Sequence, residues 1–324
     1  MAVTRNDLSL RPATAGDAAL VADLATARRP DRPEDPILMA WDWAHPDIGW
    51  RLARYVAELG DEPVGYAEWR RPDWSLDPER WGLIDAFLIP TAVTRVRLAG
   101  LFETCCHELK QEGARKAALQ VFEDVDVESD AASAAGFRRE RIEKAWELDL
   151  VAQRESLLGQ AEQARTRMRS ERIQLITLSA DRDAEKMTKL YELAKATWHD
   201  IPHSVTIVDE PFEDWAKWFE RPGWSMDRYW IARDGDRIVA LSFILYPPVR
   251  GVPETGYTGV DRAYRGRGIA AAVKLQTLAQ AIELGATAVR TDNDGQNAPI
   301  LHINERLGYR PIPGWLEFAK DLQS

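Results

Sequence analysis

Hydrophobic and polar positions change their period at one junction in the second half of the chain. Residues 254–260 form a short strand-like run, and the alanine-rich stretch after the next loop has a helical pattern with Leu275 and Leu278 on one face. The loop carries Gly266 and Gly268. The first turn of a helix has N–H groups without intrahelical partners and lies at the positive end of the helix dipole. The junction therefore favours an anion, above all a phosphate.

The first half of the chain has its own series of periodic segments. They predict, in chain order, a helix at residues 17–26, strands at 54–59 and 64–69 joined by a hairpin turn at 60–63, a strand at 83–89, a helix at 96–112, a strand at 117–122, a helix before Gly136 and a strand around Trp146.

The second half repeats this plan. Gly113 and Gly136 are separated by as many residues as Gly285 and Gly308, and strands and helices follow in the same order. We interpret this agreement as an internal duplication. Between the copies, residues 151–169 are polar and free of proline, which predicts a connecting helix. The predicted domains are therefore residues 1–152 and 171–324, joined by a helix at 153–170.

Arginines surround the glycine loop and add forked donors suited to phosphate oxygens: Arg262, Arg265 and Arg267. The loop lacks the Gly-Lys-Ser/Thr of a nucleotide-binding P-loop and the third glycine of a dinucleotide fingerprint. The alternative is a tight strand-to-helix turn with a solvated basic rim.

The loop fits the pattern Gln/Arg-x-x-Gly-x-Gly/Ala, as Arg265-x-x-Gly268-x-Ala270, and resembles the acyl-CoA pyrophosphate loop of the GNAT N-acetyltransferase superfamily. The stretch from Asn297 to Tyr309 resembles that family's second cofactor segment. The resemblance covers the second half of the chain, from residue 171 onward.

The resemblance implies an α/β (α+β) chain of two tandem GNAT-like domains, each a mixed, mostly antiparallel sheet flanked by helices. It also implies acetyl-CoA as co-substrate, with no metal. The residues that it assigns to cofactor binding are Val260, Arg265, Gly266, Arg267, Gly268, Ile269, Ala270 and Asn297.

The first copy departs from the family pattern at the loop. Residues 94–99 stand opposite 265–270, and both glycines are replaced there by longer or β-branched side chains, which block close approach of the backbone to a pyrophosphate. We therefore predict a degenerate first domain without an acyl-CoA loop. Packing, dimerisation or one wall of the acceptor cleft are its candidate uses.

Acyl transfer to an amine needs a base, because an amine with a pKa of about 10 is protonated at neutral pH. Glu254 lies six residues before Val260, so strict alternation places both on one face of the strand and Tyr257 on the other. The resemblance implies a glutamate base at this point, since some GNAT enzymes carry one. The alternative is a strand-end carboxylate in solvent.

Many GNAT enzymes use a tyrosine as general acid in the second segment, and here that position is Asn304. An amide cannot protonate a thiolate, so Asn304 would orient a water or bind the thiol, or the thiolate would leave unassisted. Asn297 shares its helix face and is also a good N-cap. His302 lies on a different face and is not assigned to catalysis.

Composition and net charge limit the kinds of molecule that the protein is expected to bind. The 324 residues suffice for two domains, and the net charge of -10 argues against nucleic acid and favours a cationic acceptor. Cys105 and Cys106 are the only cysteines and are adjacent, so neither a disulfide framework nor a thiolate metal site is expected. No leader or membrane-length apolar run is present. We expect a cytoplasmic protein that binds no membrane, as a monomer or homodimer.

Tryptophans and acidic residues gather where the family binds its acceptor, from Trp198 and His203 through Asp209, Glu210, Glu213 and Asp214 to Trp230. They suit a cationic amine, or else the tryptophans are core anchors and the acids solvated. We expect an N-acetyltransferase that acts on a small-molecule amine, such as a cationic metabolite or antibiotic, by direct transfer. The alternatives are a non-catalytic acyl-CoA sensor, another acyl group, or a thiol-pathway role like that of mycothiol synthases, whose tyrosine is replaced by Asn304.

Overall fold

The computed structural model describes residues 7–46, 49–202 and 205–323, so Met1 and His203 lie outside the described residues. The first half consists of β1 (Leu8–Pro12), α1 (Ala18–Arg28), α2 (Pro36–Ala44), β2 (Trp50–Leu59), β3 (Glu62–Pro72), β4 (Trp81–Leu88), α3 (Arg95–Gln111), β5 (Lys116–Phe122), α4 (Asp126–Ala134) and β6 (Arg138–Asp149).

Helix α5 (Arg154–Ser170) follows, at the predicted place of the connecting helix. The second half consists of β7 (Ile173–Thr177), α6 (Lys186–Trp198), α7 (Phe212–Lys217), β8 (Tyr229–Asp234), β9 (Arg237–Leu245), β10 (Glu254–Val260), α8 (Ile269–Glu283), β11 (Ala288–Asp294), α9 (Ala298–Leu307) and β12 (Arg310–Asp321). The order of helices and strands is the same in both halves.

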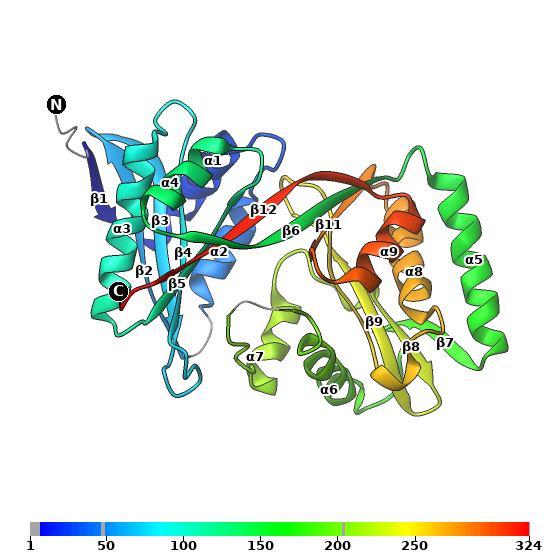
Figure 1. The fold of residues 1–324 in the computed structure, drawn as a ribbon. Helices are drawn as coiled ribbons and strands as arrows, with labels where there is room; N and C mark the ends of the chain where they lie inside the picture. Colours follow the sequence, from blue (N-terminus) through cyan, green and yellow to red (C-terminus); the bar gives the residue numbers. More distant parts are fainter. Residues whose placement is uncertain (1–6, 47–48, 203–204, 324) are drawn as a thin grey trace.

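The strands form one continuous sheet in the order β1-β2-β3-β4-β5-β12-β6-β11-β10-β9-β8-β7. The last strand of each half lies in the sheet of the other half, because β12 pairs with β5 and β6 pairs with β11. Figure 1 shows β6 in green and β12 in red crossing side by side between the halves, where they pair with each other. The predicted boundary therefore divides the chain into two copies without dividing the sheet.

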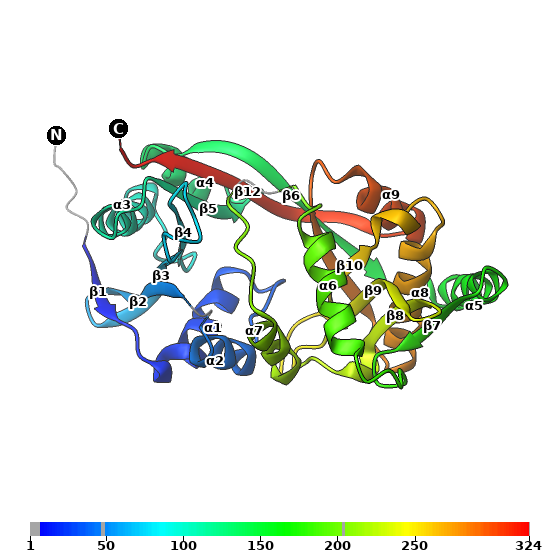
Figure 2. The same cartoon turned by 90° about the horizontal axis from the view of Figure 1, so that it is seen from below.

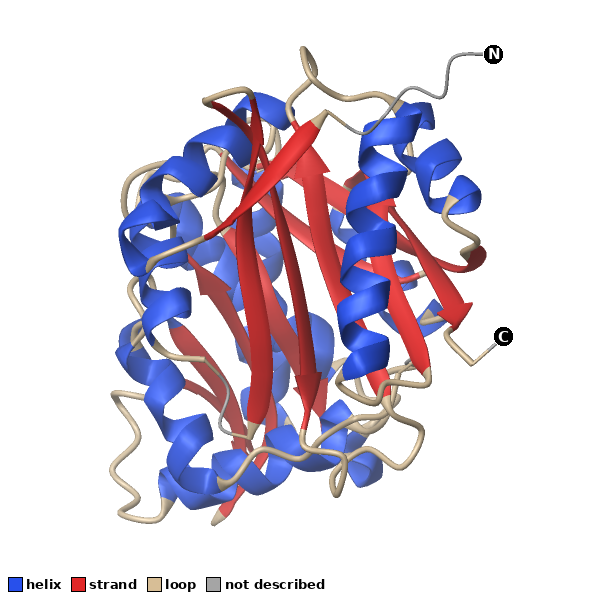
Figure 3. Ribbon diagram, turned by 90° about the vertical axis from the view of Figure 1, so that its left-hand side faces the viewer, coloured by secondary structure: helices blue, strands red, loops and turns tan. Residues whose placement is uncertain are grey.

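The sheet is mixed and mostly antiparallel, as predicted. Among the described strands, the parallel pairs are β4 with β5 and β10 with β11. Helix α8 packs against β8 and β9, and α6 packs against β9 and β10. Seen from below in Figure 2, α6 lies on the near side of β9 and α8 behind it. Helices thus cover both faces of the strands (Figure 3).

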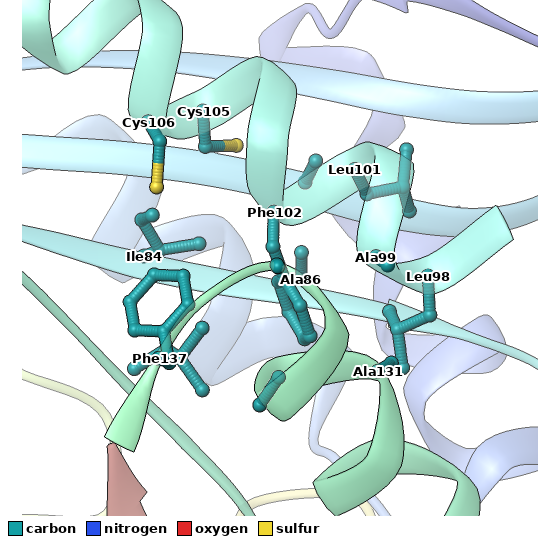
Figure 4. Packing of buried hydrophobic residues seen from close by; sticks show 14 of the residues in the cluster. Ile84, Ala86, Leu98, Ala99, Leu101, Phe102, Cys105, Cys106, Ala131 and Phe137 are labelled. Atoms are coloured by element: carbon teal, nitrogen blue, oxygen red, sulfur yellow. The ribbon is translucent and has the colours of Figure 1, made fainter. Parts of the chain in front are cut away.

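The core of the first half lies between α3, α4 and the sheet. Helix α3 repeats apolar residues at helical spacing, so Leu98, Phe102 and Cys105 fall on one buried face. Figure 4 shows Phe102 beside Phe137, whose ring meets it edge-on at 6.2 Å, with both cysteines close by. Burial raises the pKa of Cys106 to about 11, so its thiol stays protonated. The cysteines are core residues.

The repeated glycines end corresponding helices. Gly113 and Gly285 follow α3 and α8 with φ of 89° and 85°, and Gly136 and Gly308 follow α4 and α9 with φ of 84° and 87°. These left-handed conformations close a helix at low cost only with glycine. The spacing recognised in the sequence therefore marks equivalent helix ends.

The two halves also meet along a seam formed by the loop before α2 and the segment around Arg250. Asp35 accepts the backbone N–H groups of Val249 at 2.6 Å and Arg250 at 3.0 Å. Arg221 forms a two-pronged ion pair with Asp42 of α2, at 2.7 Å for each contact. In the part of the chain that is described, no helix combines the length and apolar character that crossing a bilayer requires.

Candidate functional site

The glycine loop joins β10 to α8 after a short 3-10 turn at Arg262–Tyr264. Gly266 and Gly268 have φ of 76° and 77°, a left-handed conformation that glycine adopts without strain. No side chain caps the first turn of α8. The N–H groups of Ile269 and Ala270 donate no hydrogen bond within the described residues. The positive end of α8 is therefore available to an anion, and the loop fits a pyrophosphate.

Two of the loop arginines are held by one carboxylate. Arg262 and Arg265 both form ion pairs with Asp200, which lies just after α6. Arg262, above all, holds the pKa of Asp200 down at about 2. Arg265 also donates from Nε to the carbonyl oxygen of Val260 at 3.2 Å. These bonds fix the strand end relative to the loop.

The third loop arginine meets the connecting helix. Arg267 pairs with Glu171 at 3.2 Å, and Arg167 of α5 donates to the carbonyl oxygen of Arg267 at 3.1 Å. The Arg167 guanidinium lies next to Gly268. Sequence reasoning missed Arg167 as a candidate anion ligand, because a helix outside the motif gives no spacing signal.

The equivalent turn in the first half is closed by its own side chains. The hydroxyl of Thr94 caps α3 by accepting the N–H of Arg97 at 3.2 Å. Arg97 also donates to the carbonyl oxygen of Ala92 at 2.9 Å. At α3 a first-turn N–H group is therefore already hydrogen-bonded, whereas, within the described residues, the first-turn N–H groups of α8 are free to bind an anion.

A β-bulge in β10 overturns the predicted alternation. Tyr257 lies opposite Phe243 and Thr255 opposite Ile244, so Gly256 is the extra residue. The bulge reverses the faces: Glu254 lies on the same side as Tyr257, and Val260 lies on the other side, where it packs against α8. The prediction that Glu254 and Val260 share a face was therefore wrong. The glycine inside the strand was the available signal for a bulge.

Strands β10 and β11 run parallel but pair only at Glu254 and Arg290. The two strands separate after this pair. On its other edge, β11 pairs with β6 along its whole length, and β10 pairs with β9. A cavity of about 1050 Å³ opens here. Its lining comes from β10 and β11 of the second half and from α1, α2, β3 and β4 of the first half.

Glu254 lies in this cavity, at the end of β10 where the strands part. Burial raises the pKa of Glu254 to about 7, and the charges of Asp292 and Glu34 add to the rise. The Glu254 side chain is nevertheless accessible to solvent from the cavity. Protein atoms surround the carboxylate on several sides, but they do not cover it. A carboxyl group with this pKa suits general base chemistry near neutral pH.

Asn304 is 0% exposed and does not face the cavity. Its Oδ1 accepts Lys274 Nζ at 2.8 Å, and its Nδ2 donates to Asn293 Oδ1 at 2.7 Å. Burial lowers the pKa of Lys274, itself 0% exposed, to about 7. Sequence reasoning missed Lys274, because a lysine in an alanine-rich helix reads as a solvated residue. The role of Asn304 stays a prediction.

Asn297 lies at the N-cap position of α9 and lines the cavity, but its side chain makes no capping bond. The structure thus places it among the residues near the opening between β10 and β11. His302 is exposed on α9.

Two acidic residues of the predicted acceptor segment are paired with basic side chains close to them in the sequence. Asp209 binds His199 at 2.7 Å and Lys195 at 3.1 Å, and Asp214 binds Lys217 at 2.7 Å. Trp215 and Trp224 join the core cluster beneath α6. Trp198 and Trp218 line the cavity. In the described residues, no group of three or more His, Cys, Asp or Glu side chains has the arrangement of a metal site.

Comparison with family models matches residues 187–309 to the acetyltransferase (GNAT) family. The match includes β10, the glycine loop and the helices α8 and α9. A comparison with curated proteins finds no match to the sequence.

Solved structures with the same fold include a tandem GNAT protein from the clavulanic acid biosynthesis pathway, with 16% identity and a TM-score of 0.75 over 97% of this chain and 98% of that one. A GCN5-related N-acetyltransferase from Sphaerobacter thermophilus has 17% identity and a TM-score of 0.70, covering 98% and 96%. A glucosamine N-acetyltransferase region of a fungal multi-domain protein has 14% identity and a TM-score of 0.69, covering 99% and 39%. At these identities the likeness establishes the tandem fold.

Proposed function

We propose that this chain, which has the tandem GNAT fold and matches the acetyltransferase (GNAT) family over residues 187–309, transfers an acetyl group from acetyl-CoA to a primary amine of a small molecule. The observation that carries the proposal is the position of Glu254. It lies in the cavity where β10 and β11 part, with a pKa of about 7.

The loop supports the binding half of the proposal. The left-handed Gly266 and Gly268, the uncapped first turn of α8 and the arginines Arg267 and Arg167 form a cradle for a pyrophosphate. An added Cβ at Gly266 would meet no atom within 4 Å, so space is open in front of the backbone there. Backbone N–H groups of β10 at the bulge would face the thioester carbonyl.

The chemistry is a direct transfer in a ternary complex. The amine nitrogen attacks the thioester carbonyl carbon, a C–N bond forms and the C–S bond breaks. Glu254 takes the proton of the amine, and the CoA thiolate leaves and takes a proton from water, since its ordinary pKa of about 8.5 makes it a fair leaving group. We place the reaction in the cytoplasm, without nucleic acid, membrane or metal.

The test is a thiol-release assay with acetyl-CoA across a panel of amines, followed by a pH profile with the best acceptor. We expect kcat/KM to rise as pH rises through about 7, because Glu254 must lose its proton to act as a base. Glu254→Gln should lower kcat at least about 100-fold while acetyl-CoA affinity stays unchanged. Propionyl- and succinyl-CoA, tested beside acetyl-CoA, define the acyl group.

Glu283→Gln is the control, because Glu283 ends α8 far from the cavity lining and should keep full activity. If no amine releases thiol above hydrolysis although acetyl-CoA binds, the chain is an acyl-CoA sensor and the proposal is wrong. A pH profile that persists unchanged in Glu254→Gln would remove Glu254 from the mechanism.

A further inference from the structure

The charged side chains that line the cavity do not balance one another. Each lining arginine except Arg32 lies within 4.0 Å of a carboxylate. Apart from Arg32, the charged lining residues that form no ion pair within the described residues are seven acids and one lysine: Glu34, Asp35, Asp85, Glu143, Glu254, Asp292, Glu317 and Lys274. The unpaired charge facing the cavity is therefore mostly negative.

Asp85 occupies a position that costs stability. It lies on β4 directly opposite Glu68 of β3, and like charges in this arrangement repel. Glu68 is satisfied by Arg54 at 2.6 Å, and the nearby Arg28 is engaged by Glu128 through two contacts of 2.7 Å. Burial raises the pKa of Asp85. Asp85 is nevertheless exposed to the cavity and forms no hydrogen bond or ion pair among the described residues, so its carboxylate is available to a ligand.

Glu34 links Asp85 to the reaction centre. It lies in the loop before α2, and burial, then the charge of Asp85, raises the pKa of Glu34. Glu34 in turn contributes to the raised pKa of Glu254. It is therefore within electrostatic reach of both, and the three carboxylates form an acidic path from the second half to the first. Arg250 holds this loop by donating to the carbonyl oxygen of Glu34.

Two further features of the lining suit a cation. Oε1 of Glu317 is shielded from water and has no hydrogen-bond partner among the described residues. Trp43 of α2, whose ring already carries the Arg54 guanidinium 4.7 Å from its centroid, and Trp198 of α6 line the same cavity, so its lining includes aromatic rings of the kind that bind positive groups. The volume of about 1050 Å³ also exceeds what a short monoamine would fill.

We propose that the acceptor is an elongated amine with at least two positive charges, whose second cationic group is bound by Asp85 and Glu34 of the first half while its reacting nitrogen lies at Glu254. This inference rests on the function proposed above. It gives the degenerate first half a role in acceptor selection.

The experiment compares α,ω-diaminoalkanes with n-alkylamines of equal length in the thiol-release assay, with the full chain. We expect kcat/KM to be roughly 100-fold higher for the best diamine than for its monoamine partner. Asp85→Asn and Glu34→Gln should each lower kcat/KM for the diamine roughly 10-fold more than they lower kcat/KM for the monoamine, which lacks the second cationic group. Glu103→Gln, an exposed carboxylate of α3 outside the cavity lining, should change neither rate.

Equal rates for diamine and monoamine, or the same loss for both substrates in Asp85→Asn, would overturn the inference while the acyltransferase proposal stands. Calorimetric titration with the diamine separates the two failures. If the chain transfers no acetyl group but binds the diamine, and Asp85→Asn abolishes binding, the diamine site is present and the proposed acyltransferase function fails. If the wild-type chain neither binds the diamine nor acetylates it, the inference is wrong.

Discussion

At the scale of single residues, the position of a left-handed glycine distinguishes a binding role from a structural one. Gly268 and Gly285 are both left-handed, with φ of 77° and 85°, but only Gly268 precedes the open turn of α8. Alanine at either position should cost roughly 1–2 kcal/mol of stability, because a Cβ is strained there. Only Gly268→Ala should also raise the acetyl-CoA KM, by about 10-fold or more, since it shifts the N–H groups that face the pyrophosphate.

Denaturant unfolding and steady-state kinetics of the two variants provide the measurement. Gly285→Ala is the matched control, because an added Cβ there meets no atom within 4 Å. Equal KM values for the two variants would contradict the assignment of the loop.

Lys274 predicts a pH dependence of stability. Its pKa is lowered to about 7 by burial, whereas an unfolded lysine has the ordinary value of 10.5. Between these values the folded chain binds fewer protons, so stability rises with pH. Relative to Lys274→Met, the wild-type free energy of unfolding should increase by ~3 kcal/mol between about pH 7 and pH 9.5.

Urea denaturation at several pH values measures the difference. The variant leaves Asn304 Oδ1 without its partner, but that cost does not depend on pH, so only the slope is interpreted. Parallel curves for both proteins would mean that Lys274 keeps its proton in the folded state.

Residue-level prediction from the sequence worked where a residue's role follows from local backbone geometry. The loop glycines lie between a strand and a helix as predicted, and the repeated glycines follow corresponding helices, where all of them adopt a left-handed conformation. It failed at β10, where Gly256 inserts a bulge and turns Glu254 away from the face of Val260. Strict alternation assumes that no residue is inserted in the strand. The face of Glu254 therefore could not be predicted from its distance in sequence to Val260.

At the scale of helices and strands, most elements of the first half were predictable, because they follow from a local hydrophobic period. Strand β1 and helix α2 were not predicted, because 5 and 9 residues give too short a period to recognise. The boundaries of β10 agree with the predicted residues 254–260. The exchange of β6 and β12 was not predictable. Both strands pair with strands of the other half, which are distant in the sequence. The alternation of polar and apolar residues in β6 and β12 would suit a neighbouring strand from either half.

The exchanged strands predict that neither half folds alone. Without β12, the first half would leave the edge of β5 unpaired, and β6 would project without β11. Residues 1–153 and 154–324, produced separately, should show no cooperative thermal transition. Produced together, they should form a one-to-one complex that unfolds cooperatively.

Circular dichroism melts and size-exclusion chromatography of the separate and co-produced fragments test this expectation. The co-produced pair is the control for the cut itself, because it contains the same break in the chain. A cooperative transition of residues 1–153 alone would show that strand exchange is dispensable.

At the scale of the whole molecule, the seam between the halves sets the cavity. Asp35 is 4% exposed and accepts four backbone N–H groups, those of Ile37 and Leu38 in α2 and those of Val249 and Arg250 across the seam. Burial pushes the pKa of Asp35 up, but the four donors outweigh it and hold the pKa below its usual value. The carboxylate therefore stays charged and joins the halves next to Glu34.

Asp35→Ala should lower the free energy of unfolding by about 3 kcal/mol, because it removes a helix cap and leaves two further backbone donors, those of Val249 and Arg250, without their partner. The matched control is Thr94→Ala, which removes a cap within one half and should cost about 1 kcal/mol. Measuring activity distinguishes a role of the seam in shaping the cavity from a general loss of stability. The loop that carries Glu34 loses its anchor only in Asp35→Ala, so kcat/KM for the best acceptor should fall there and remain at the wild-type value in Thr94→Ala. If both variants keep full activity at a temperature where both are folded, the cavity does not depend on the seam and the first half acts through its side chains alone.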